Sequence, residues 1–253
     1  MHDGEEPGAG PAMPGGPGPG GPADPADVDR ALLERIRAAP VLAGPLPHFD
    51  PDRAPDAPGP LLAGWLDRAL ADGLPEPHVM TLSTAAPDGT PSARVLMLRG
   101  VDSADCSVVF AGDARSRKGR DLAAHPVAAA TFYWPAHGRQ IRLAGPVVTL
   151  SAEAAWRDFL GRSPASRAAA FTGTVSAPLA GPEEYARERL AAEALVSAEP
   201  DRVPEWHTVY RLRAGEAEFF QADPHRGHLR LRYTRDGDRS PGNGDWTRTL
   251  LWP

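Results

Sequence analysis

The sequence contains one lysine, Lys118, and one cysteine, Cys106, among its 253 residues. A single cysteine excludes an intramolecular disulfide and is typical of proteins in a reducing cytoplasm. No apolar run is long enough to span a bilayer, and the N-terminus lacks both the basic start and the hydrophobic stretch of a secretion signal. These absences predict a cytoplasmic protein with no membrane partner.

An excess of positive charge is also missing, because the formal net charge is −6. Without a basic surface, a role in binding nucleic acid is not indicated. The basic residues are nevertheless clustered, which favours a small anionic ligand over a polyanion. The two clusters are Arg94, Arg99, Arg115, Arg117, Lys118, Arg139 and Arg142 in mid-chain, and Arg226, Arg230 and Arg232 near the end.

The first part of the chain has few large apolar residues, and Gly and Pro make up more than half of residues 1–25. Such a segment cannot bury enough surface to offset the entropy lost on ordering. We therefore predict a disordered tail over residues 1–27. Residues 28–253 show no internal repeat and are predicted to form a single domain.

Residues 73–253 alternate mainly between strand-like segments and short connections, which predicts a mainly β fold with helices. The Asp-Gly pair at Asp88-Gly89 lies between two β-prone segments and is a strong hairpin signal. Short links between antiparallel neighbours favour a small barrel. We predict strands at 79–84, 92–99, 107–110, 127–134, 139–145, 207–213, 216–221, 229–234 and 246–251, helices at 28–38, 61–70, 152–160 and 183–196, and a hairpin loop at 236–245.

The only lysine lies in Ser116-Arg117-Lys118, just before a segment that reads as the first turns of a helix. A helix N-terminus already carries partial positive charge and unpaired N–H groups. Cations crowded at that end are favourable only opposite an anion, and phosphate is the usual ligand. We interpret Arg117, Lys118 and Arg94 as a phosphate clamp.

Five motifs in order over about 180 residues resemble the pyridoxamine 5′-phosphate oxidase family of FMN enzymes. They are Ala93-Arg94-Val95-Leu96-Met97-Leu98-Arg99, Ser116-Arg117-Lys118-Gly119, Arg139-Gln140-Ile141-Arg142-Leu143-Ala144-Gly145, Glu218-Phe219-Phe220-Gln221 and Arg226-Gly227-His228-Leu229-Arg230. The chain also ends in Leu250-Leu251-Trp252-Pro253, where the family closes on Arg-Leu-x-Pro. The resemblance implies an FMN-binding split β-barrel that forms a homodimer.

In the family the cofactor lies in a groove between two subunits. The resemblance implies that the partner supplies Ser176, Phe220 and Arg230, and Gln140 offers the donor and acceptor that suit the flavin's pyrimidine edge. Phe220 replaces a common Trp, and Val175 replaces a common Gln before the matched serine. The implied FMN-binding residues are Arg94, Val95, Met97, Leu98, Arg99, Ser116, Arg117, Lys118, Gln140, Ser176, Phe220 and Arg230.

The substrate side departs further from the family. Asp158 places a carboxylate where a phosphate-binding Tyr is expected, and Trp206-His207-Thr208 replaces Trp-Gly-Gly. Repulsion by Asp158 would weaken the binding of a phosphorylated substrate. The resemblance implies that Arg226 and His228 orient the substrate ring over the flavin, as the catalytic pair. The implied substrate-binding residues are Arg99, Asp158, Arg162, Ser166, Arg226 and His228.

These residues favour an FMN-dependent oxidase that dehydrogenates a small heteroaromatic amine or alcohol with O2 and gives H2O2. The family reaction forms pyridoxal 5′-phosphate from pyridoxine or pyridoxamine phosphate. One alternative is an oxidase of secondary metabolism that aromatises a dihydrophenazine-like intermediate, and another is a flavin-binding protein without turnover. No metal is expected, because His225 and His228 have neither cysteine nor clustered carboxylates beside them.

Overall fold

The computed structural model describes residues 25–235 and 246–253. The chain divides into two compact units, Met1–Val41 and Leu42–Pro253. In the first unit α1 (Pro25–Ala38) has no buried residue. The predicted tail lies outside the described residues except for 25–27, which form the first turn of this helix. The predicted loop at 236–245 also lies outside them.

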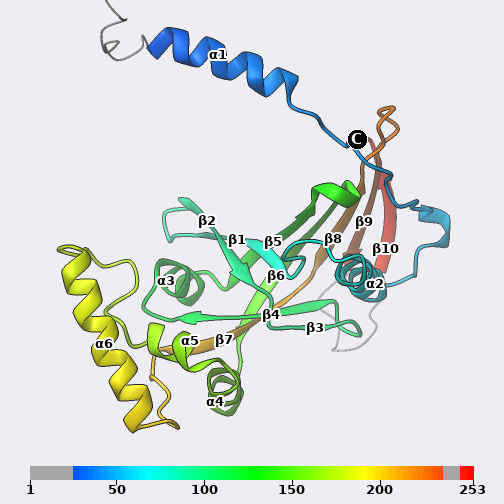
Figure 1. Cartoon of the computed structure of the whole chain (residues 1–253). Helices are drawn as coiled ribbons and strands as arrows, with labels where there is room; N and C mark the ends of the chain where they lie inside the picture. The colour runs from blue at the N-terminus through cyan, green and yellow to red at the C-terminus, as the bar shows by residue number, and fades with distance from the viewer. Residues whose placement is uncertain (1–24, 236–245) are drawn as a thin grey trace, which may run out of the picture. The chain divides into compact units, whose positions relative to one another are not determined.

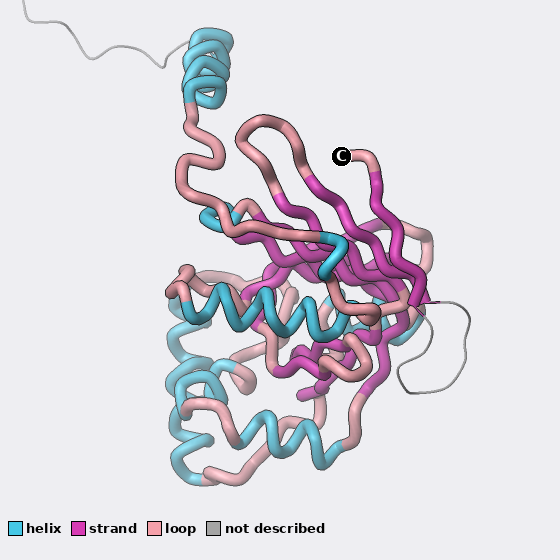
Figure 2. Tube along the Cα trace, turned by 90° about the vertical axis from the view of Figure 1, so that its right-hand side faces the viewer, coloured by secondary structure: helices cyan, strands magenta, loops and turns pink. Residues whose placement is uncertain are grey.

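The second unit is built around a curled, mostly antiparallel sheet flanked by helices (Figures 1 and 2). Its main path runs β10-β9-β8-β6-β5-β1-β2, and β4 joins β3 to β7, which pairs with β6. The strands are β1 (Val79–Ala85), β2 (Pro91–Met97), β3 (Gly100–Asp102), β4 (Ser107–Asp113), β5 (Val127–Trp134), β6 (Arg139–Thr149), β7 (His207–Arg213), β8 (Glu216–Gln221), β9 (Leu229–Arg235) and β10 (Trp246–Leu251).

The long strand β6 joins the two parts of the sheet. Its first half pairs with β8, whereas its last residues, Val147–Thr149, pair with β7. Gly145 stands where the partner changes, and a Cβ there would lie 2.1 Å from the carbonyl oxygen of Arg213. Only glycine allows the two backbones to approach this closely, so Gly145 permits the curl that closes the sheet.

The helices cover the sheet at two places (Figure 1). Trp65 packs edge-on against Phe219 of β8 and against Phe49, so α2 closes one side of the core. At the other place α4 packs on β7, and α5 and α6 pack on each other. The helices of this unit are α2 (Pro58–Ala71), α3 (Arg117–Ala124), α4 (Ala152–Leu160), α5 (Pro164–Ala169) and α6 (Pro182–Ala198), with short 3-10 turns at Pro51–Arg53 and Pro135–His137.

The predicted mainly β fold and the hairpin at Asp88-Gly89 are confirmed. Thr84 pairs with Ser92 across β1 and β2, and Asp88 Oδ1 accepts a 2.9 Å hydrogen bond from the Thr90 N–H inside the turn. Two short elements, β3 and α5, were not predicted, because each is too short to give a periodic signal. Strand β4 also extends three residues beyond the predicted end at 110, to Asp113.

Candidate functional site

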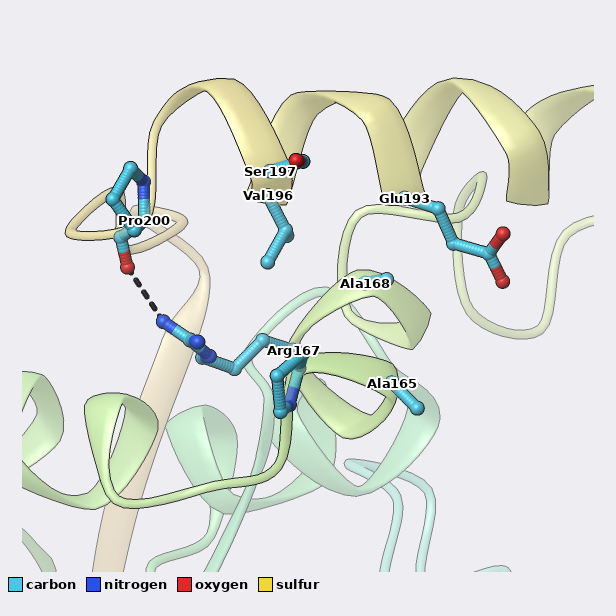
Figure 3. A pocket seen from close by; sticks show the side chains of 8 residues that line it. Ala165, Arg167, Ala168, Glu193, Val196, Ser197 and Pro200 are labelled. Carbon is cyan, nitrogen blue, oxygen red and sulfur yellow. Dashed lines mark hydrogen bonds between the residues drawn. The ribbon is translucent and has the colours of Figure 1, made fainter.

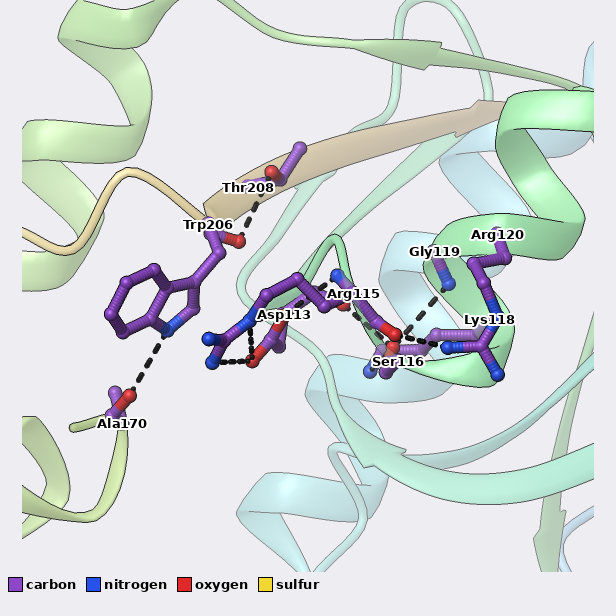
Figure 4. Close-up of polar contacts among 9 residues, drawn as sticks. All are labelled: Asp113, Arg115, Ser116, Lys118, Gly119, Arg120, Ala170, Trp206 and Thr208. Atoms are coloured by element: carbon purple, nitrogen blue, oxygen red, sulfur yellow. Dashed lines mark hydrogen bonds and ion pairs between the residues drawn. The ribbon is translucent and has the colours of Figure 1, made fainter. Parts of the chain in front are cut away.

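The start of α3 gathers the predicted phosphate clamp. Ser116 caps the helix: its Oγ accepts from the Gly119 N–H at 3.3 Å and donates to the Asp113 carbonyl at 2.6 Å. Lys118 Nζ donates to the same Oγ at 3.0 Å (Figure 4). The first turn contains no acidic residue, so two cations, Arg117 and Lys118, stand at the positive end of the helix.

Arg94 reaches the same region from β2. Its guanidinium donates to Thr84 Oγ1 at 2.8 Å and to Ser92 Oγ at 2.7 Å. Thr84 Oγ1 in turn donates to the buried Asp121 of α3 at 2.6 Å. Burial lowers the pKa of Arg94, and the nearby charge of Arg117 lowers it further, against the opposite effect of Asp121. Strand β2 and helix α3 thus bring the positive charges of Arg94 and Arg117 close to each other.

The side chain of Lys118 lies across Gly112, where a Cβ would stand 2.3 Å from Cε and 2.6 Å from Nζ. Position 112 therefore has to be glycine for the lysine to take this path. Burial lowers the pKa of Lys118, and the charge of Arg94 adds to the shift. A partly buried ammonium beside a guanidinium is stabilised by an anion, so the donor set fits the phosphate of FMN.

Next to the clamp lies a pocket of about 210 Å³, which Gly112 and Asp113 help to line. Arg115 does not enter the clamp: it pairs with Asp113 at 2.7 Å and lies 3.8 Å above the ring of Trp206 (Figure 4). The pocket is lined by Arg99, Ala111, Gly112, Asp113, Arg162, Ser166, Ala169, Ala170, Val175, Trp206 and His207. Three of the predicted substrate-binding residues therefore share one cavity.

Asp158, another predicted substrate-binding residue, is not among the residues that line this pocket, and it is paired. Its Oδ2 accepts from His207 Nε2 at 2.9 Å, and its Oδ1 lies 3.6 Å from Arg99 Nε. Burial of Asp158 acts to raise its pKa, but the hydrogen bond from His207 and the charge of Arg99 outweigh it, so the pKa is lowered. The carboxylate is ionised and held by two partners, which a lone Asp in the sequence could not reveal.

A second group of predicted residues lies at the end of β8 and the start of β9. Gln140 of β6 pairs with Phe220, which pairs with Arg230 on its other side. The rings of Phe220 and His228 lie 5.4 Å apart. His228 Nδ1 accepts from the Asp223 N–H at 2.9 Å, so the neutral ring carries its proton on Nε2. Arg226 stands beside it with a left-handed backbone, φ 68°.

This group and the clamp are separated within one chain. The order β8-β6-β5-β1-β2 puts four strand spacings, about 19 Å along the sheet, between Phe220 and Arg94. Val95 and Met97 lie on β2 with exposed side chains, and Leu98 follows that strand. Ser176 is exposed, with a backbone φ of 67°. A single chain therefore places the predicted cofactor residues in two groups.

A larger hollow of about 420 Å³ between α5 and α6 contains none of the predicted site residues (Figure 3). Its lining includes Arg167, which donates to the Pro200 carbonyl. In the part of the chain that the structure describes, no group of three or more His, Cys, Asp or Glu residues could hold a metal. No helix there has the length and apolar character needed to cross a membrane.

Sequence reasoning missed His207, Asp113 and Thr84 as parts of the site. His207 had a signal, since it lies in one of the segments that depart from the family pattern. Thr84 had none, because its contact with Asp121 depends on where β1 and α3 meet, whereas Asp113 pairs locally with Arg115, two residues further on.

Two sequence profiles match the chain in tandem. Residues 66–207 match the profile described as pyridoxamine 5′-phosphate oxidase, and residues 207–253 match the C-terminal dimerisation region of pyridoxine 5′-phosphate oxidase. A pyridoxine/pyridoxamine 5′-phosphate oxidase of Burkholderia lata is 42% identical over 189 residues, 75% of this chain and 86% of that protein. One from Bordetella petrii is 39% identical, over 80% of this chain and 92% of its own.

Solved structures agree with these matches. PhzG from Burkholderia lata, solved in complex with tetrahydrophenazine-1-carboxylic acid, has 32% identity and a TM-score of 0.75, covering 83% of this chain and all of that one. A pyridoxamine 5′-phosphate oxidase-related, FMN-binding protein from Nostoc punctiforme shares the fold, with 20% identity, a TM-score of 0.62, and coverage of 81% of this chain and all of that one. The chain belongs to the pyridoxamine 5′-phosphate oxidase family and is an oxidoreductase.

Proposed function

We propose that the protein is a cytoplasmic, homodimeric, FMN-dependent oxidase that dehydrogenates a small heteroaromatic substrate and passes the electrons to O2. The observation that carries the cofactor assignment is the convergence of Arg94, Arg117 and Lys118 at the start of α3. No acidic residue of the first turn neutralises them, and a phosphate would. The family match supports the same cofactor.

When bound, FMN would supply the redox chemistry: removal of two electrons and two protons from the substrate and their delivery to O2 as H2O2. The residues of this chain would bind and orient the cofactor and the substrate. Arg94, Arg117 and Lys118 would hold the phosphate, and Gln140 would offer a donor and an acceptor to the ring. Arg99, Arg162 and Ser166 would hold the anionic group of the substrate in the adjoining pocket.

The second group of residues supports a homodimer. Phe220 lies on β8, His228 lies just before β9, and Arg230 lies on β9. All three fall within the segment that matches a dimerisation region. In one chain Phe220 and Arg94 are separated by four strand spacings along the sheet. A two-fold partner would bring its own group to the clamp, so that each site draws on both chains.

Two alternative substrate classes each have support. The curated relatives support pyridoxine or pyridoxamine phosphate. The likeness to PhzG, together with the Asp158 carboxylate held against Arg99 at the edge of the pocket, favours a dihydrophenazine-like intermediate that is aromatised. Both reactions remove two electrons from a ring compound, so the same flavin site serves either.

The test is to purify the protein, add FMN, and measure flavin absorbance and peroxide production under air. Pyridoxamine phosphate, pyridoxine phosphate and a dihydrophenazine carboxylate are compared, with anaerobic samples as the control. We expect a yellow protein that produces peroxide with one class. A protein that takes up no FMN would contradict the cofactor, and a yellow protein without turnover on any of the three would support a flavin-binding role instead.

A further inference from the structure

His207, which lines the pocket around Arg99, Arg162 and Ser166 (the anion pocket), forms a buried pair with Asp158. The side chain of His207 is 3% exposed and that of Asp158 is 15% exposed, and Nε2–H donates to Oδ2 at 2.9 Å. The ring of His207 also packs edge-on against Phe159, with centroids 5.0 Å apart. Packing and hydrogen bond together fix the imidazole, so its proton holds Asp158 in one position.

The pair changes the charge that the pocket offers to a ligand. Asp158 lies between His207 and Arg99, so one of the two pocket guanidinium groups already faces a carboxylate. Arg162 is the other, and its Nε is buried without a hydrogen-bond partner among the described residues. Burial lowers the pKa of Arg162, and the charge of Arg99 lowers it further, against the opposite effect of Asp158.

The guanidinium groups of Arg99 and Arg162 and the carboxylate of Asp158 together carry a net formal charge of one positive. Asp113 does not alter this sum, because it is neutralised by Arg115. A dianionic phosphate ester would leave one negative charge uncompensated in a partly buried pocket, whereas a carboxylate would match it. Ser166 can add a hydroxyl donor to either group.

We infer that His207 is a positioning residue that holds Asp158 against Arg99 and thereby sets the pocket to receive a monoanionic ring carboxylate in preference to a phosphate ester. This inference rests on the proposed function, since it names the substrate class of the same site. The selectivity between carboxylate and phosphate ligands is then set by the His207–Asp158 pair and not by Asp158 alone.

The experiment measures anion selectivity by calorimetric titration of the FMN-loaded protein with phenazine-1-carboxylate and with pyridoxal 5′-phosphate. The wild type should bind the carboxylate at least about tenfold more tightly, which corresponds to about 1.4 kcal/mol. His207→Ala should shift the ratio of the two dissociation constants about tenfold toward the phosphate. His207→Gln retains an N–H donor toward Asp158 and should keep the wild-type ratio, which a loss of packing would not explain.

Asp158→Asn is the substitute variant if His207→Ala does not fold, because it removes the carboxylate charge at nearly constant volume. Asp158→Asn should shift the ratio of the dissociation constants in the same direction. A wild type that prefers the phosphate, or a ratio unmoved in His207→Ala or in Asp158→Asn, would overturn the inference. Flavin content and peroxide production are measured on the same samples. If the variants are yellow and active but the ratio of the two dissociation constants is unchanged, only this inference is contradicted. If the protein binds no FMN, the proposed function is contradicted. The ratio is then measured on the apoprotein.

Discussion

Lys118 Nζ lies 3.0 Å from Ser116 Oγ, the atom that caps α3. The hydroxyl therefore links the cap of the helix to the one lysine of the chain. Because the side chain also passes over Gly112, which lines the anion pocket, the clamp and the pocket adjoin. On the proposed function, a cofactor phosphate at the clamp would lie next to a substrate in the pocket.

The clamp residues Arg117 and Lys118 are predicted to be required for FMN binding. Replacing Arg117 and Lys118 together by Ala should give protein that purifies colourless, because two charge-assisted donors to the phosphate are lost. Flavin absorbance per protein chain is the measurement. Arg120→Ala is the matched control, since Arg120 is an exposed cation of the same helix that donates to the Arg115 carbonyl, and it should stay yellow. A full flavin spectrum in the double variant would remove the clamp assignment.

The flavin-loaded protein should be a dimer at micromolar concentration in analytical sedimentation, because the predicted cofactor residues fall in two groups on one chain. Leu250→Glu changes an exposed apolar residue, 56% accessible, within the dimerisation segment and should give monomer that has lost its flavin. Leu190→Glu on α6, 67% accessible and outside that segment, is the control and should remain dimeric. A flavin-loaded monomer would contradict the prediction.

Asp158 predicts the kinetics on a phosphorylated substrate. Pyridoxamine phosphate should be a poor substrate of the wild type, because the carboxylate opposes its phosphate and occupies Arg99. Asp158→Tyr and Asp158→Asn should raise kcat/KM for pyridoxamine phosphate about tenfold or more, roughly 1.4 kcal/mol. Efficient wild-type turnover with no gain in either variant would instead indicate ordinary vitamin B6 metabolism.

Cys106 should be unreactive in the folded protein. Its side chain is buried, and burial raises the pKa of the thiol to about 12. Because the folded pKa lies above the ordinary value, the thiolate fraction at pH 8 falls to about one in ten thousand. A coloured disulfide reagent should therefore label the native protein only on the timescale of unfolding, and label it at once in guanidinium. Rapid native labelling would show that the residue is accessible.

The sequence by itself determined the family, most of the elements and the composition of the clamp. Strands such as β5 and the hairpin at Asp88-Gly89 follow from alternation and turn chemistry, which are local properties. The placement of Arg117 and Lys118 at a helix start is local too, since the cap Ser116 immediately precedes them.

Tertiary structure alone decided the partners of the charged groups. Asp158 and His207 are 49 residues apart, and Thr84 and Asp121 are 37 apart, so neither contact has a local signal. They form because α4 packs on β7 and α3 packs on β1. In sequence, Asp158 is an acidic residue where a hydroxyl is expected. In the folded chain it is an ionised carboxylate held between an imidazole and a guanidinium, because the charge of a buried group depends on the neighbours that folding brings to it.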